Sequence, residues 1–171
     1  MAAELTKKNP RTDSLRGFTL LEVLMAVALV AILSVAAITQ FTDFTQDAKT
    51  AVTKERMNTI RVAIKGDARM VSNGQFVRPG FEAHIGALPG SKTAQSGLTA
   101  LNELITNPGS YSAYSITTKT GWRGPYLSQV DSSWSKDGWG SDFEFDPSAR
   151  TLKSKGPDAQ LGTSDDLVIQ L

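Results

Sequence analysis

Residues 16–38 read RGFTLLEVLMAVALVAILSVAAI, and this stretch decides the fold. From Phe18 to Ile38 it is 21 residues long and carries a single charge, that of Glu22. A helix of that length rises about 31 Å at ~1.5 Å per residue, which matches the ~30 Å hydrocarbon core of a bilayer. A secretory signal has a shorter apolar core of roughly 7–15 residues. The run therefore predicts a membrane-spanning helix over residues 18–38.

The residues before the run, 1–17, form a basic leader with a net charge of +2. Basic flanks predict that the leader stays cytoplasmic and that the rest of the chain is exported. A simple anchor leaves Glu22 unexplained, because a charge at a bilayer centre costs roughly 2.5–3.5 kcal/mol on insertion scales. If the chain were cut between Gly17 and Phe18, the new α-amino group, with a pKa of roughly 7.7–8.0, would be largely cationic. A neighbouring copy could present that amine to Glu22.

The stretch RGFTLLEVLMAVALVAIL resembles the N-terminus of type IV pilins and type II secretion pseudopilins. Their pattern is a short basic leader, Gly, a cleavage site, Phe, then Thr-Leu-[Leu/Ile]-Glu and an apolar helix, and residues 17–22 match it position by position. The resemblance implies that a prepilin peptidase cleaves after Gly17 and N-methylates Phe18. It also implies that Glu22 guides assembly by pairing with the N-terminus of an adjacent subunit.

The helix is expected to continue beyond the apolar run. Residues 39–56 contain no proline, and a stripe at helical spacing follows: Met57, Ile60, Ile64, Ala68 and Val71. A helix from about Phe18 to about Ser72 is predicted, with Asn73-Gly74 as its stop. A separate amphipathic helix over 57–71 is the alternative. The predicted organisation is a cleaved leader (1–17), a membrane or filament-core helix (18–38), its amphipathic continuation (39–72) and a globular head (73–171).

The head is predicted to hold a small antiparallel sheet and one short helix. YLSQV, DFEFD, TLKSK and LVIQL are short β-like segments separated by turn residues, and LTALNELIT is a helix candidate. The fold class is therefore α+β: a long N-terminal helix packed on a small C-terminal antiparallel β-sheet head, a pilin-like arrangement. Trp122, Trp134 and Trp139 lie among glycines and are expected to fill a small core.

Composition excludes several kinds of protein. The 171-residue chain has a net charge of +1, so no nucleic-acid partner is expected. It has no cysteine, which rules out disulfides, thiolate metal sites and a cysteine nucleophile. GALPGSKT (86–93) resembles a phosphate loop, but Ser91 stands where that motif needs glycine, so an ordinary loop is predicted. His84 is the single histidine and is interpreted as a satisfied loop residue, and the chain is not expected to be an enzyme.

The C-terminal segment SKGPDAQLGTSDDLVIQL (154–171) is rich in acidic residues. From the residues alone, solvated turn carboxylates are the favoured interpretation, since the spacing is not that of an EF-hand. Major pseudopilins end in a similar loop that binds one Ca²⁺, and GWRGPYL (121–127) and DGWGSDFEF (137–145) resemble their segments too, with Gly138 at a usual proline position. The resemblance implies side-chain ligands Asp158, Asp165 and Asp166, with carbonyl ligands from Lys155 and Thr163.

The resemblance implies a structural subunit that polymerises into the periplasmic pseudopilus of a type II secretion system. Its expected partners are other copies, the prepilin peptidase, an inner-membrane assembly platform, minor pseudopilins and, before assembly, membrane lipid. The expected location is the bacterial inner membrane, single-pass, with the head in the periplasm. The alternatives are a type IV pilin of a surface fibre for adhesion, motility or DNA uptake, and a monomeric membrane-anchored binding module.

Overall fold

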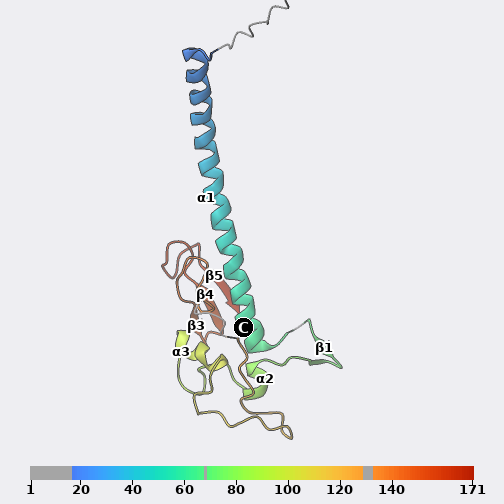
Figure 1. Cartoon of the computed structure of the whole chain (residues 1–171). Helices are drawn as coiled ribbons and strands as arrows, with labels where there is room; N and C mark the ends of the chain where they lie inside the picture. Colours follow the sequence, from blue (N-terminus) through green and yellow to red (C-terminus); the bar gives the residue numbers. More distant parts are fainter. Residues whose placement is uncertain (1–16, 68, 129–132) are drawn as a thin grey trace, which may run out of the picture. The chain divides into compact units, whose positions relative to one another are not determined.

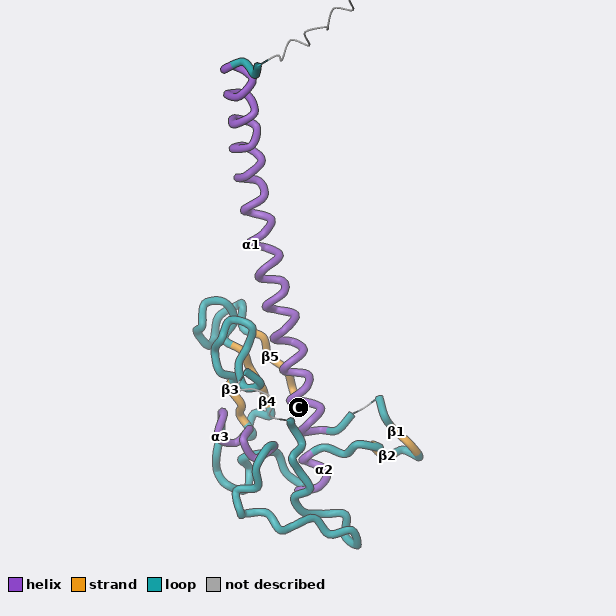
Figure 2. The backbone as a smooth tube through the Cα atoms, in the orientation of Figure 1, coloured by secondary structure: helices purple, strands orange, loops and turns teal. Residues whose placement is uncertain are grey.

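The structure is a computed structural model, and it describes residues 17–67, 69–128 and 133–171. The chain divides into two units, residues 1–42 and 43–171. One helix, α1 (Leu20–Lys65), passes through both (Figures 1 and 2). The second unit adds the strands β1 (Val71–Ser72), β2 (Gln75–Phe76), β3 (Glu144–Asp146), β4 (Thr151–Ser154) and β5 (Leu167–Gln170), and the short helices α2 (Phe81–Ile85), α3 (Gly97–Leu101) and η1 (Asn102–Leu104).

The predicted α+β architecture is confirmed, but the helix ends at Lys65 rather than near Ser72. Gly66 follows with a φ of 96°, in the left-handed region that favours glycine. A Cβ at this position would lie 2.8 Å from the carbonyl oxygen of Arg78, so the returning chain passes too close for a side chain. The expected stop at Asn73-Gly74 is instead the turn of the β1–β2 hairpin, with φ angles of 51° and 75°.

The sheet has the order β3-β4-β5, and both neighbouring pairs are antiparallel. It confirms the strands predicted in DFEFD, TLKSK and LVIQL. The YLSQV prediction was wrong for its described residues, 126–128, and residues 129 and 130 lie outside the described part. The backbone N–H groups of Tyr126 and Leu127 both donate to the carbonyl of Leu104, so this segment pairs with η1 instead of a strand.

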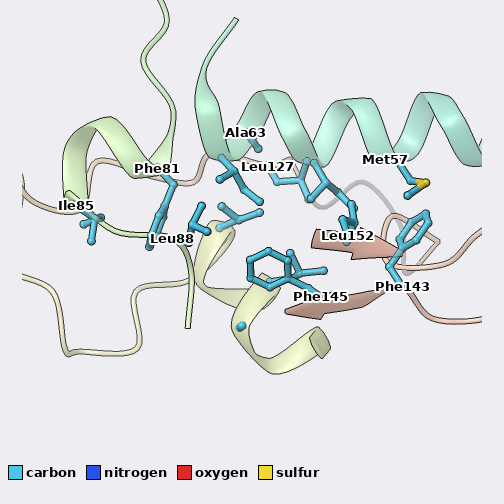
Figure 3. Close-up of a cluster of buried hydrophobic side chains, with 14 of the residues drawn as sticks. Met57, Ala63, Phe81, Ile85, Leu88, Leu127, Phe143, Phe145 and Leu152 are labelled. Carbon is cyan, nitrogen blue, oxygen red and sulfur yellow. The ribbon is translucent and has the colours of Figure 1, made fainter. Parts of the chain in front are cut away.

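The core lies between the last turns of α1 and the sheet (Figure 3). Met57, Ile60 and Ile64 are almost fully buried, which confirms the predicted stripe up to Ile64. Ala68 lies outside the described residues, and Val71 belongs to β1. The opposing side chains come from several elements: Phe81, Leu101, Leu104, Phe143, Phe145 and Leu152. The helix predicted in LTALNELIT is present as α3 followed by η1.

Polar contacts fix the end of α1 to the rest of the head. The Glu82 carboxylate in α2 accepts from Lys65 Nζ at 2.8 Å and from Arg150 Nη2 at 2.9 Å. Burial opposes ionisation of Glu82, but the hydrogen bonds and charges of Lys65 and Arg150 outweigh it and lower its pKa. This carboxylate therefore joins the last turn of α1 to α2 and to the turn before β4.

The tryptophans are used in two ways. Trp122 and Trp134 pack against the core, as expected. Trp139 lies outside that cluster, and its indole Nε1 donates to Gln46 Oε1 at 2.7 Å on α1. The neighbouring Gly138 lies directly against the α1 backbone, and a Cβ there would overlap the Lys49 carbonyl oxygen. Its N–H also donates to Thr53 Oγ1 at 2.8 Å. Proline has no N–H, so this contact accounts for glycine at the position where the resembling sequences have proline.

Candidate functional site

The N-terminal motif is exposed where it enters α1. Gly17 has open space around it, since a Cβ added there would meet no atom within 4 Å. Phe18 is 83 % exposed and precedes the first helical residue, Leu20. The peptide bond between Gly17 and Phe18 is therefore in non-helical, accessible backbone. The leader, residues 1–16, lies outside the described residues.

Thr19 forms the N-terminal cap of α1. Its side-chain oxygen accepts from the Glu22 N–H at 3.2 Å, and its carbonyl accepts from the N–H groups of Glu22 and Val23. Thr19 and Glu22 have the Thr-x-x-Glu spacing of a capping box. The Glu22 carboxylate also lies in the first turn, where the helix dipole favours a negative charge. The position of Glu22 in the first turn therefore also favours the start of the helix.

The first unit presents apolar side chains on every side of α1. The described hydrophobic residues from Leu20 to Val35 are about half to four-fifths exposed, for example Leu20 at 79 % and Leu33 at 67 %. A helix that is apolar all round needs a protein interior or a lipid environment. Within the described residues, no helix combines the length and the hydropathy of a membrane span.

The predicted metal ligands lie in the loop between β4 and β5. Gly156, with a φ of 64°, has no room for a side chain, because a Cβ would lie 2.6 Å from both the carbonyl and Oδ2 of Asp165. The Asp158 N–H donates to Asp165 Oδ2 at 3.4 Å, and the Gly162 N–H donates to Asp166 Oδ2 at 2.7 Å. The loop thus brings Asp158 and Asp165 together through the backbone of one and the side chain of the other.

The loop itself shifts the pKa of one of these groups, Asp165. Hydrogen bonds, first from the Thr163 side chain and then from backbone N–H groups, lower the pKa of Asp165. Asp166 Oδ1 is buried and has no hydrogen-bond partner. Across the described residues, no three His, Asp or Glu side chains are grouped so that they could hold a metal ion. The Asp158 carboxylate instead accepts from the Gln160 N–H at 2.8 Å. The Thr163 carbonyl accepts from the Asp166 N–H at 3.4 Å, so it already has a partner within the loop.

The sequence did not predict two buried carboxylates that each accept several hydrogen bonds within the head. Glu103 is 2 % exposed and accepts from Gly90 N–H at 2.8 Å, Thr93 Oγ1 at 2.5 Å and Tyr111 Oη at 2.6 Å. Asp137 is also 2 % exposed and accepts from backbone N–H groups of its own turn and from Ser154 Oγ at 2.7 Å. For Asp137, the turn residues DGWGS (137–141) could have indicated a carboxylate that accepts from its own turn. For Glu103, no neighbouring residue in the sequence indicates burial.

The segment that resembles a phosphate loop and the single histidine both have structural roles. The GALPGSKT segment is a loop in which Lys92 Nζ donates to the Ile85 carbonyl. His84 is buried in α2, not in a loop, and its Nδ1 lies 3.0 Å from Tyr126 Oη. Burial and the charge of Arg123 lower the pKa of His84, so the ring is neutral near neutral pH.

Residues 15–38 match the family model described as the prokaryotic N-terminal methylation motif. Comparison with curated proteins and with solved structures found no match. The matched motif supports the type IV pilin and pseudopilin family in general and does not distinguish a pseudopilus subunit from a pilus subunit. Pilin-like proteins with this motif are membrane-anchored, are processed by prepilin peptidase and polymerise into filaments.

Proposed function

We propose that this pilin-like chain is a subunit of the periplasmic pseudopilus of a type II secretion system, assembled from the inner membrane with its head in the periplasm. The observation that carries the proposal is the methylation motif, with an accessible Gly17–Phe18 bond before a capped apolar helix. The absence of cysteine and the acidic C-terminal loop favour a pseudopilin over a surface pilin. The partners are other copies, minor pseudopilins and the membrane assembly platform.

Processing is tested by the intact mass of the chain extracted from its native membrane. We expect loss of residues 1–17 and gain of one methyl group on Phe18. A Gly17→Val variant should keep its full mass, since only a very small residue is expected to fit the peptidase at the cleavage site. A wild-type chain of full length would overturn the proposal and favour the monomeric anchored module.

The system is identified by deletion of this chain in its host. Loss of exported protein from the medium, with cell surface fibres unchanged, supports the pseudopilus. Loss of surface fibres with normal secretion would instead identify a type IV pilin.

Substitution of Glu22 separates its two roles. We expect Glu22→Ala and Glu22→Gln to insert in the membrane but to reduce filament yield by about tenfold or more, because both remove the charge that pairs with the Phe18 amine of a neighbour. Glutamine still suits the capping box. Thr19→Ala is the matched control: it removes the cap, worth about 0.5–2 kcal/mol, and keeps the carboxylate. Normal filaments from Glu22→Gln would contradict pairing and leave only capping.

The second part of the proposal is a Ca²⁺ site in the loop of residues 154–166. Carboxylate and carbonyl oxygens are the ligands that Ca²⁺ prefers. The buried, unpartnered Asp166 Oδ1 and the close approach of Gly156 to Asp165 support it. Asp158, Asp165 and Asp166 would hold the ion with the carbonyls of Lys155 and Thr163, after the side chains turn from their present backbone N–H donors. The ion would tie the loop to β4 and β5.

Calcium binding is tested by thermal unfolding of the processed chain in detergent, with Ca²⁺ or with chelator. A ligand at 100 times its Kd stabilises the folded state by about 2.7 kcal/mol, so the midpoint should rise with Ca²⁺. Asp165→Ala with Asp166→Ala should abolish that rise, whereas Asp43→Ala with Asp47→Ala, exposed acids on α1, should keep it. An identical wild-type midpoint in Ca²⁺ and in chelator would remove the metal site.

A further inference from the structure

The second unit contains a cavity of about 620 Å³ beside the last turns of α1. Val62 and Val77 line it with accessible apolar side chains, Ala63 and Leu127 lie almost buried beneath them, and Arg78 and Arg123 are also in the lining. Ligand pockets in proteins commonly have volumes of about 300–1,000 Å³. The cavity is therefore large enough to receive side chains of another molecule.

Arg78 and Arg123 have no carboxylate partner among the described residues. Both are exposed, and neither takes part in the salt bridges of this part of the chain. The Arg123 guanidinium stacks over the Tyr114 ring at 5.0 Å, which leaves its N–H groups available at the edge. Asp67 also lines the cavity, and its Oδ1 accepts from the Arg69 N–H. Its carboxylate keeps its charge, so the lining is cationic by one formal charge. The cavity thus offers two guanidinium groups suited to carboxylates.

A complementary face lies on α1 of the same chain. Asp43, Phe44 and Asp47 are exposed and spaced at i, i+1 and i+4, so the two acids lie on one helix face with Phe44 at its edge. Phe44 is 71 % exposed. No hydrogen bond or ion pair engages either carboxylate within the described residues. The acidic loop of residues 154–166 is a poorer donor of carboxylates, because its aspartates already accept from their own backbone N–H groups.

The two faces cannot meet within one chain. Asp43 and Asn58, which lines the cavity, lie on one helix, about 22 Å apart along its axis at ~1.5 Å per residue. A contact between them must join two copies displaced along the helix. Such a contact uses different surfaces on the two copies, and a heterologous contact that does not close continues as a filament.

We propose that the cavity at Arg78 and Arg123 receives Asp43, Phe44 and Asp47 of a second copy. The two carboxylates pair with the two guanidinium groups, and the Phe44 ring packs on Val62 and Val77. The inference rests on the proposed filament and names the head contact within it.

Cysteine crosslinking tests the contact, because the chain contains no native cysteine. Asp47→Cys and Arg78→Cys are made on separate full-length copies, co-expressed in the native membrane and oxidised. We expect a disulfide-linked dimer that needs both variants, since a disulfide requires Cα atoms about 4.4–6.8 Å apart. Ser148→Cys, exposed on another part of the head, is the control and should not crosslink to Asp47→Cys.

Charge reversal gives a second readout. Arg123→Glu should reduce filament yield by about tenfold or more, since opposed like charges disfavour an interface, and Asp47→Arg in the same chain should restore it. If the wild type forms processed filaments but the Asp47→Cys and Arg78→Cys pair gives no crosslink, or if Arg78→Cys crosslinks to Asp165→Cys instead, this contact alone is overturned. Absence of wild-type filaments would overturn the proposed function itself.

Discussion

Replacement of Glu103 by alanine is expected to lower the free energy of unfolding of the head by at least about 3 kcal/mol, since each buried donor left without an acceptor costs about 1–3 kcal/mol. The substitution removes the acceptor of three donors: Gly90 N–H, Thr93 Oγ1 and Tyr111 Oη. Urea unfolding of the processed chain, followed by tryptophan fluorescence, measures the change. Trp122 is a suitable reporter, because its indole Nε1 donates to the Glu103 carbonyl.

Glu55→Ala is the matched control, since Glu55 is exposed on α1 and its side chain has no partner in the described residues. Its effect should be within about 0.5 kcal/mol. Tyr111→Phe should cost less than Glu103→Ala, because the carboxylate keeps two of its three donors. Equal stability of Glu103→Ala and Glu55→Ala would show that the network relaxes or admits water.

The same network predicts a loss of stability at high pH. Burial, and then the hydrogen bond to Glu103 and its charge, raise the pKa of Tyr111 above its ordinary value of 10.0. A group whose pKa is raised by folding stabilises the folded state fully below its unfolded pKa, and that contribution disappears as the pH rises towards the folded pKa. Stability should therefore decline above about pH 10 in wild type, and Tyr111→Phe should remove this part of the decline.

The elements that the sequence predicts well are those whose signal is local. The apolar run and the spacing of Met57, Ile60 and Ile64 each depend on neighbours within a few residues, and α1 follows them. The alternation in DFEFD places Phe143 and Phe145 in the core, as the structure has them. The methylation motif is contained in the same local stretch as the start of α1.

The features that the sequence analysis missed depend on segments far apart in the chain. Gly66 ends α1 because the chain returns at Arg78 and leaves no room for a Cβ, which spacing alone does not reveal. Glu103 looks like a surface residue of a short helix until Tyr111 and Gly90 surround it. YLSQV has strand-like composition, yet η1 takes its N–H groups. In the acidic loop, backbone N–H groups hold the carboxylates that the resemblance assigns to calcium.

Gly138→Pro is expected to reduce the free energy of unfolding by at least about 3 kcal/mol, since overpacking alone costs typically about 1–3 kcal/mol and a lost buried hydrogen bond adds to it. The Cβ of the new ring would overlap the Lys49 carbonyl oxygen, and Thr53 Oγ1, on a fully buried residue, would lose its donor. Gly138→Ala keeps the N–H and should cost less. Gly140→Ala lies in the same loop, with open space around it but a φ of 96°. It therefore measures the cost of conformational strain alone, about 1 kcal/mol.

Because Asp137 and Trp139 flank the contact of Gly138 with α1, the proline variant should also free the indole of Trp139 from Gln46 and shift its fluorescence to longer wavelength. A proline variant as stable as wild type would mean that the loop can withdraw from α1, and that the glycine is not required by this packing.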